Sequence, residues 1–172
     1  MDNQNLNLID FTAATYRENK ATKHLASLLK NISRSQPGTG VVYAILAETL
    51  SEKLGHHDEA IEAFSNAIVL DPNRSDYYNG MGLAYYRKKD FNSALNTFSE
   101  ASKIDPNDAV ARYNEACIHS LLNNKSKAIN KLKDALALDP RLTENVKSDA
   151  DLDNIRGEAA FQEMLPSTAI SH

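Results

Sequence analysis

A stretch of thirteen residues occurs three times in the middle of this chain at a fixed spacing. It reads AIEAFSNAIVLDP from Ala60 to Pro72, ALNTFSEASKIDP from Ala94 to Pro106 and AINKLKDALALDP from Ala128 to Pro140. The copies begin at Ala60, Ala94 and Ala128, a constant spacing of 34. A constant period of this length is typical of a protein built from stacked helical hairpins.

The residues shared by the three copies lie on one face of a helix. Each copy opens with an alanine, followed four positions later by a large apolar residue and three positions after that by a second alanine. These residues are Ala60, Phe64, Ala67, Ala94, Phe98, Ala101, Ala128, Leu132 and Ala135. Such spacings place all three residue types on one side of a helix. The Asp-Pro pair then ends the helix, because proline lacks a backbone donor and restricts the residue before it.

The unit from 75 to 108 carries the pattern most fully. Its characteristic residues are Tyr78, Met81, Gly82 and Tyr85 on a first helix and Ala94, Phe98, Ala101 and Pro106 on a second. This pattern resembles the tetratricopeptide repeat, with further copies at residues 41–74 and 109–140. The resemblance implies an all-α fold, a right-handed superhelix of stacked antiparallel helical hairpins, and a non-catalytic role in protein–protein interaction.

Two of the repeats depart from the family pattern. In the first repeat, strict counting places Glu48 at a tight helix contact, whereas a shift of one residue places Ala47 there. The shift also brings Tyr43, Leu46 and Leu50 into register, so we expect one extra residue before Gly55. In the third repeat, Glu115 stands where an apolar residue is preferred, which predicts either looser packing or an open edge.

The segments outside the repeats have distinct patterns. Residues 1–7 and 166–172 are expected to be flexible ends. Residues 8–36 are expected to be helical, either as a degenerate hairpin shifted by about one residue with a turn at 18–20, or as one capping helix. Residues 141–165 resemble the C-terminal helical cap of similar proteins, with helices expected at 142–147 and 158–165. Asp149, Asp151 and Asp153 are expected to cap or turn between these two helices.

Composition limits the compartment and the kind of partner. The 172 residues include 19 Lys and Arg against 23 Asp and Glu, and this formal charge of −4 is not the basic footprint of a nucleic-acid-binding protein. The single cysteine, Cys117, cannot form an intramolecular disulfide. The start of the chain lacks a signal-peptide pattern, and no stretch approaches the roughly 20 apolar residues that cross a bilayer. We therefore expect a cytoplasmic protein without a membrane span.

The first helices of stacked hairpins line a concave face, where an extended peptide or a partner helix can bind. Counting from the middle repeat predicts the groove residues. They are Ile45, Asp76, Asn79, Gly80, Leu83, Tyr86, Arg87, Val110, Tyr113, Asn114, Cys117 and Leu121. A related subset of the family binds the C-terminal carboxylates of heat-shock proteins with cationic side chains. The corresponding places here hold Ile45, Thr49, Gly80, Val110 and Asn114, none of which is a cation, so this mode of binding is not expected.

The chemistry of the side chains gives little indication of catalysis. Adjacent histidines at 56 and 57 do not converge as metal ligands, His119 falls at an aromatic packing position, and Cys117 has no basic neighbour in sequence. We therefore expect neither an enzyme, a cofactor nor a metal site. The expected function is that of a scaffold or adaptor for another protein. The alternatives are an assembly factor or chaperone for one subunit of a larger complex, and self-association into a homo-oligomer.

Overall fold

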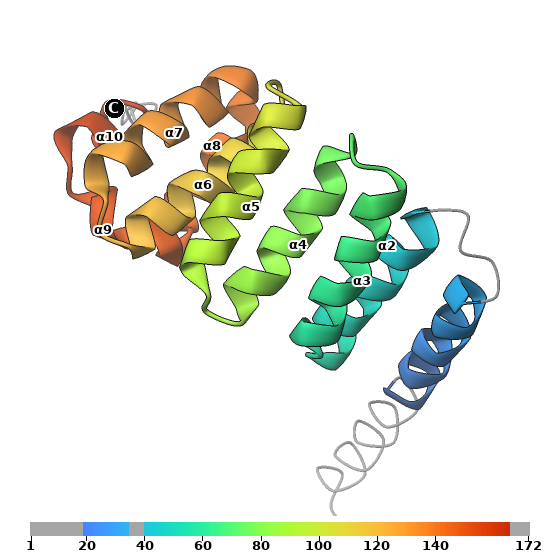
Figure 1. Cartoon of the computed structure of the whole chain (residues 1–172). Helices are drawn as coiled ribbons and strands as arrows, with labels where there is room; N and C mark the ends of the chain where they lie inside the picture. The colour runs from blue at the N-terminus through green and yellow to red at the C-terminus, as the bar shows by residue number, and fades with distance from the viewer. Residues whose placement is uncertain (1–18, 35–39, 166–172) are drawn as a thin grey trace, which may run out of the picture. The chain divides into compact units, whose positions relative to one another are not determined.

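The computed structural model describes residues 19–34 and 40–165, which form helices joined by short turns (Figure 1). They belong to two compact units, Met1–Pro72 and Asn73–His172. The first unit contains a helix over residues 19–34, α2 (Gly40–Glu48), the π-helical turn η1 (Thr49–Lys53) and α3 (His57–Leu70). The second contains α4 (Ser75–Arg87), α5 (Phe91–Ile104), α6 (Ala109–Leu121), α7 (Lys125–Leu138) and a C-terminal cap. The two expected flexible ends, and the part of the expected 8–36 helical segment that precedes residue 19, lie outside the described residues.

Antiparallel hairpins form where the repeat pattern predicts them, which confirms the all-α fold of stacked helix pairs. Helix α2 pairs with α3, α4 with α5, and α6 with α7, and α5 also packs on α6. In the second unit, Ala94 and Ala128 have no exposed surface, and Phe98 and Leu132 fill the adjacent space at 1% and 0% exposure. Small side chains thus allow neighbouring helices to approach closely, and one bulky residue per repeat fills the core between them.

The turn after each first helix is also periodic. Gly55, Lys89 and Asn123, which share the repeat spacing, have φ angles of 69°, 63° and 58°. Only glycine adopts this left-handed region freely, although asparagine enters it more easily than most residues. In the second and third hairpins, the amide that follows the turn bonds to a carbonyl five residues earlier, as in Asp90 N to Tyr85 O at 3.0 Å.

The first hairpin accommodates one extra residue at this turn. The amide of His56 bonds to the carbonyl of Leu50 at 2.9 Å, six residues earlier instead of five. The additional residue is taken up by the π-helical turn η1, Thr49–Lys53, since such a turn bonds i to i+5. Ala47 is consequently buried at 0% exposure, while Glu48 is exposed. The expected one-residue shift is therefore confirmed.

The helix over residues 19–34 packs in a register that differs from the expected one. Ala26 and Ser33 are its buried residues, at 7% and 3% exposure, and they match Ala60 and Ala67 at the strict spacing of 34. The predicted shift of one residue is therefore wrong for this helix. Asn19 and Lys20 are helical, so the turn expected there is also wrong. The choice between a hairpin and one capping helix depends on residues that precede 19, outside the described part.

Glu115 is buried and neutralised, and this corrects the expectation of loose packing or an open edge. Its side chain is 3% exposed and lies 2.7 Å from the Nζ of Lys131 on α7. The hydroxyl of Ser102 on α5 donates to the other carboxylate oxygen at 2.6 Å. A buried carboxylate is tolerated when a cation and a hydrogen-bond donor satisfy it. Glu115 therefore links three helices through polar contacts at an otherwise apolar position.

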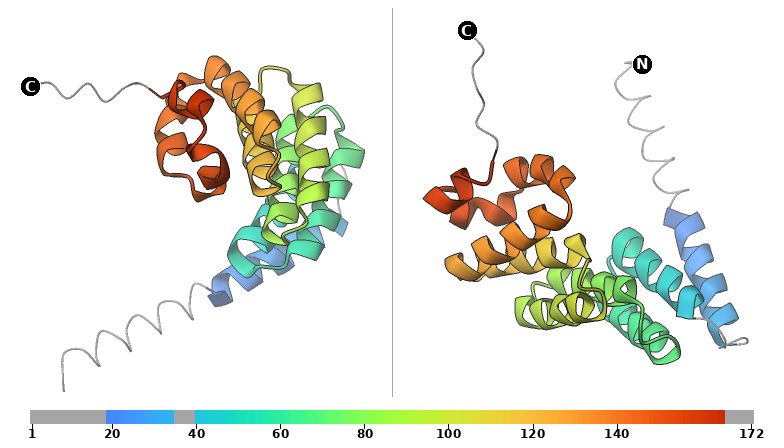
Figure 2. Two further views of the ribbon diagram at one scale, coloured as in Figure 1. Left: turned by 90° about the vertical axis from the view of Figure 1, so that its left-hand side faces the viewer. Right: turned by 90° about the horizontal axis from the view of Figure 1, so that it is seen from above.

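The cap covers the end of the last hairpin and contributes its own apolar residues to the core. It consists of η2 (Pro140–Leu142), α8 (Thr143–Ser148), η3 (Ala150–Leu152), α9 (Asp153–Arg156) and α10 (Ala159–Gln162). Val146, Leu152, Ile155 and Phe161 have no exposed surface and pack with α6 and α7. Figure 2 shows the cap, in red, folded against these helices. The segment between the two expected cap helices is itself helical over 150–156, beyond the turn that was expected.

Arg156 stabilises the cap from within. Its guanidinium donates to the carbonyls of Lys147 and Asp149, both at 2.7 Å, and lies 5.7 Å from the ring centre of Phe161. These carbonyls lie at the end of α8, where the backbone has no helical donor.

No helix in the described part of the chain has the length and apolar character needed to cross a membrane.

The contact at Gly82 gives a test of this packing. A Cβ added there would lie 2.5 Å from a ring carbon of Phe98, whose side chain is buried. We expect Gly82→Ala to destabilise the fold, because overpacking costs about 1–3 kcal/mol, more than the roughly 1 kcal/mol that alanine gains in a helix. Urea unfolding followed by circular dichroism measures the difference. Gly157→Ala is the control, since nothing lies within 4 Å of an added Cβ there; a Gly82→Ala variant as stable as this control would contradict the packing.

Candidate partner-binding groove

A cavity of about 90 Å³ lies on the face of the second unit that α4 and α6 share with the cap. We call its surroundings the groove. Its lining is Leu83, Tyr86, Phe98, Asn114, Cys117, Ile118, Asp149 and Asp151. Four of these eight residues, Leu83, Tyr86, Asn114 and Cys117, are among those that the sequence predicted for a binding surface. The structure therefore brings together part of the predicted set.

The remaining predicted residues lie in varied environments. Ile45, on α2 in the first unit, and Val110, at the start of α6, are exposed by 44% and 51%. Asp76 and Arg87 are exposed, and Asn79, Gly80 and Leu121 are half-buried. Tyr113 is buried, with 8% exposure. The groove residue Cys117 is also buried, with 6% exposure.

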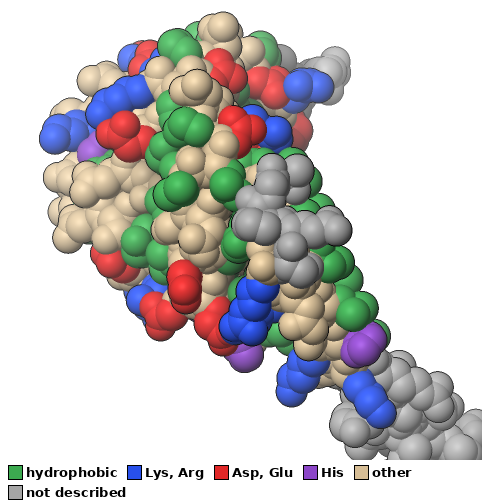
Figure 3. Space-filling model, turned by 45° about the vertical axis from the view of Figure 1, so that its right-hand side comes forward, with side chains coloured by type: hydrophobic (Ala, Val, Ile, Leu, Met, Phe, Trp, Pro, Cys, Tyr) green, Lys and Arg blue, Asp and Glu red, His purple; other side chains and the backbone are tan. Residues whose placement is uncertain are grey.

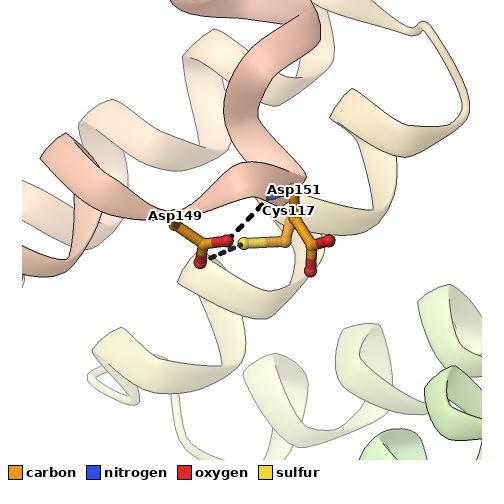
Figure 4. Close-up of side chains that lie close together, drawn as sticks. All are labelled: Cys117, Asp149 and Asp151. Atoms are coloured by element: carbon orange, nitrogen blue, oxygen red, sulfur yellow. Dashed lines mark hydrogen bonds between the residues drawn. The ribbon is translucent and has the colours of Figure 1, made fainter.

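The cap covers Tyr113 and Cys117, the two predicted groove residues of α6 that are buried. The hydroxyl of Tyr113 donates to Oδ2 of Asp149 at 2.5 Å, and the thiol of Cys117 lies 3.7 Å from the same oxygen. Asp149 also caps η3, because its other oxygen accepts from the amide of Asp151 at 2.9 Å. Figure 4 shows Asp149 and Asp151 on either side of Cys117. One end of the groove is thus filled by the chain's own C-terminal segment.

The sequence did not identify Asp149 and Asp151 as groove residues. They lie far along the chain from Cys117 and belong to the cap, which does not repeat the hairpin pattern. The only local signal was the Asp-x-Asp spacing, which predicted a capping role and not contact with α6. The long-range placement depends on the cap's apolar residues, which dock it on α6 and α7.

Burial and negative charge keep the groove's hydroxyl and thiol groups protonated. Burial is the main cause, and the hydrogen bond to Asp149 the second cause, that raises the pKa of Tyr113 far above its ordinary value. Burial, and to a smaller extent the negative charges of Asp149 and Asp151, likewise raise the pKa of Cys117. Burial and the contact with Asp151 raise the pKa of Tyr86 to about 12, and burial raises the pKa of Asp151 itself. A thiol held in this form is a poor nucleophile and a poor metal ligand.

Cys117, Asp149 and Asp151 have ligand atoms within 4.8 Å of one another, which is close enough for a metal ion. The geometry does not favour metal binding, because Asp149 already accepts bonds from Tyr113 and from its own turn. His119, the other residue considered for chemistry, is buried at 7% exposure, and this burial lowers its pKa. It is therefore a core histidine, as expected from its packing position.

Two of the predicted groove residues have local structural partners. The amide of Asn79 donates to Asp108 at 2.6 Å, and Asp108 also caps the start of α6 through the amide of Ala111. Asp76 is paired with Arg74 at 2.7 Å, and this hydrogen-bonded pairing lowers the pKa of its carboxyl. Asn79 therefore ties α4 to the start of α6 and helps to fix the spacing of the groove.

The first unit contains a larger cavity, of about 390 Å³, between the 19–34 helix and the hairpin α2–α3. Its lining includes Lys30, Ser33, Tyr43, Glu59 and Glu62. The hydroxyl of Tyr43 donates to the carbonyl of Ser33 at 2.9 Å, and Lys30 pairs with Glu59 at 3.4 Å. These contacts join the helix to the hairpin, so the cavity is the space left by polar packing between them.

Comparison with known proteins identifies the repeat. One family model, described as TPR repeat, matches residues 53–89, and another, described as tetratricopeptide repeat, matches residues 75–108. Anaphase-promoting complex subunit 3 of Schizosaccharomyces pombe is 32% identical over 103 residues, which cover 60% of this chain and 14% of that protein. The chain thus spans about a seventh of the length of this relative.

Solved structures share the fold at low identity. The crystal structure of MamA superposes with a TM-score of 0.69 at 16% identity, covering 81% of this chain and 79% of that one. YrrB, described as a TPR protein with an unusual peptide-binding site, superposes with a TM-score of 0.62 at 22% identity, covering 73% and 64% of the two chains. At these identities the likeness concerns the fold alone.

The protonated groove predicts a dependence of stability on pH. Cys117, Tyr86 and Tyr113 ionise at a lower pH in the unfolded chain, near about 8.5 for Cys and 10 for Tyr, than in the folded one. The stability that these groups contribute to the folded state is therefore fully present below the unfolded pKa and is lost as the pH rises above it. We expect the free energy of unfolding, measured in urea, to fall between pH 8 and 10.5.

The variant Cys117→Ala isolates the contribution of the thiol. Because Cys117 is the only cysteine, its removal should flatten the early part of the decline, between about pH 8.5 and 10. Parallel curves for wild type and variant over this range would show that burial does not hold the thiol protonated.

Proposed function

Because this chain is a tetratricopeptide repeat protein, we propose that it is a non-catalytic scaffold that holds another protein in its groove. Tetratricopeptide domains typically serve protein–protein interaction and are usually non-catalytic. The observation that carries the proposal is the cavity between α4, α6 and the cap, where residues predicted for binding line a recess with both apolar and polar walls.

The recess has the chemistry of an anchoring site for one side chain. Leu83, Phe98 and Ile118 provide apolar walls, and Asn114 offers an amide that can both donate and accept hydrogen bonds. A recess of about 90 Å³ suits an aliphatic side chain of a peptide or of one partner helix. Binding energy in such interfaces concentrates on a few well-packed anchors.

The cap restricts where a partner binds. Tyr113 and Cys117 are covered through Asp149, so the proposed contact surface on α6 is Asn114, while α4 contributes Leu83 and Tyr86. Asp149 and Asp151 place carboxylates at the edge of the recess. They favour a partner that presents N–H donors or a basic side chain next to its apolar anchor.

A second candidate is a transient role in assembling a larger complex. It is suggested by the fission-yeast relative, a subunit of the anaphase-promoting complex, because a related repeat chain that works within a larger complex raises the question of how such complexes are assembled. A permanent scaffold remains in the mature complex with its partner, whereas an assembly factor is absent from it. Fractionation of the mature complex therefore distinguishes the two.

The groove proposal predicts the effect of a double variant. Leu83→Ala with Asn114→Ala removes two sides of the recess without removing the bond between Tyr113 and the cap. We expect the amount of partner captured by crosslinking in the source cells to fall at least tenfold. The helical signal in circular dichroism should stay unchanged. The matched control is Asn96→Ala with Lys103→Ala, two residues that line a different cavity of the same unit. Equal capture by the groove variant and this control would refute binding in the groove.

A further inference from the structure

The repeats provide an internal standard for which positions face solvent. Three places on each second helix are polar in all three hairpins. They are Glu59, Glu62, Asn66, Ser93, Asn96, Glu100, Lys127, Asn130 and Asp134. Eight of these nine side chains are exposed and Ser93 is half-buried. Polar residues at these places are therefore what this fold ordinarily presents to water.

The 19–34 helix breaks this rule at the same three places. Its register follows the strict spacing of 34, as the buried Ala26 and Ser33 establish, so the solvent-facing places fall on Leu25, Leu28 and Ile32. These side chains are exposed by 47%, 46% and 43%. We call these three residues the apolar stripe. Three large apolar side chains on the outer face of one helix are a departure that ordinary solvation does not explain.

The charge of this helix is equally distinctive. Residues 19–34 contain Lys20, Lys23, Lys30 and Arg34 and no Asp or Glu, in a chain whose formal net charge is −4. In Figure 3 the hydrophobic side chains of this helix gather along one edge, and Lys and Arg lie mainly along the opposite one. A helix with an apolar stripe and a purely basic polar face is typical of segments that lie on an anionic surface.

The helical geometry places Lys20 roughly 80° from the nearest stripe residue, whereas Lys23, Lys30 and Arg34 lie roughly 120° to 140° away, toward the opposite side of the helix. At 100° per residue, Leu25, Leu28 and Ile32 fall within an arc of roughly 60°. His24 and then Lys20 follow on one side of the stripe, and half-buried Leu29 leads on the other side toward the contact with the repeat. Long basic side chains beside an apolar stripe can keep their charge at a polar boundary while their stems lie against apolar surface.

We propose that the apolar stripe and the basic polar face of the same helix form a docking surface for an anionic lipid membrane, on which the 19–34 helix lies without spanning it. The stripe enters the boundary between headgroups and acyl chains. Lys20, next to it, contacts the phosphate and carboxylate groups, and the remaining cations of the helix add longer-range attraction. Electrostatic attraction to anionic headgroups and burial of the leucine and isoleucine side chains act together.

Two other occupants fit the observations less well. A second copy of the same stripe would bring two helices of formal charge +4 side by side, which like-charge repulsion disfavours. A partner helix that binds in a groove needs flanking walls, but neither cavity described beside this helix is lined by stripe residues. The stripe is therefore a ridge, which suits an extended flat surface. Glu59 on α3, an acidic side chain beside this helix, is paired with Lys30 and His56.

Vesicle co-sedimentation with the full chain tests the proposal. The probes are vesicles of phosphatidylcholine and phosphatidylserine in a two-to-one ratio and vesicles of phosphatidylcholine alone, at low and high salt. We expect at least tenfold tighter binding to the anionic vesicles, weakened by high salt because the attraction is partly electrostatic.

A variant with Leu25→Ser, Leu28→Ser and Ile32→Ser gives these places the polar character of the other three hairpins, so the fold is expected to be retained, as circular dichroism would verify. It should bind anionic vesicles at least tenfold more weakly. The matched control is Val69→Ser, at an 80% exposed apolar residue of the same unit outside the stripe, which should bind like wild type.

Three outcomes would overturn the proposal. They are no binding to anionic vesicles, equal binding to both vesicle types, and equal binding by the stripe variant and wild type. If the wild-type chain bound an acidic protein through the stripe but did not bind anionic vesicles, the first outcome would apply and the membrane proposal would be wrong. The groove variant Leu83→Ala with Asn114→Ala leaves the stripe intact, so it should bind vesicles like wild type, and the two proposals can fail separately.

Discussion

The close approach of helices at alanine residues is the constraint on which the rest of this structure depends. Ala60, Ala94 and Ala128 have no exposed surface, so a small side chain allows close helix contact in each of the three hairpins. The constraint is strong enough that the first hairpin inserts a π-helical turn to keep Ala47 at its contact. A larger side chain at such a position would force the helices apart.

The cap converts this regular stack into an asymmetric surface. Its apolar residues dock on α6 and α7, and that docking brings the Asp149 carboxylate onto Tyr113. The bond covers one end of the groove and leaves the recess beside Leu83 and Asn114. The proposed binding surface is therefore smaller than the repeat pattern alone predicts, and its edge is acidic because the chain's own C-terminal segment forms it.

The sequence predicted what is local and periodic. The shared alanines, the hairpin turns and the extra residue before Gly55 all follow from spacing along one or two helices. It did not predict that Glu115 is satisfied by Ser102 and Lys131, because that contact joins three helices and depends on side-chain placement. The position of Asp149 in the groove was missed for a similar reason. The register of the 19–34 helix differs from the expected one-residue shift, because the small Ala26 and Ser33 occupy the core positions while the large Leu25 and Ile32 are exposed.

The most direct test of this account is native-state hydrogen exchange across α6 and residues 150–156. If the cap is an integral part of the groove, the amides of both segments should exchange through one shared opening, and Asp149→Ala should accelerate both together. A cap that exchanges freely while α6 keeps its full protection would contradict the account, because Tyr113 and Cys117 would then belong to an open surface.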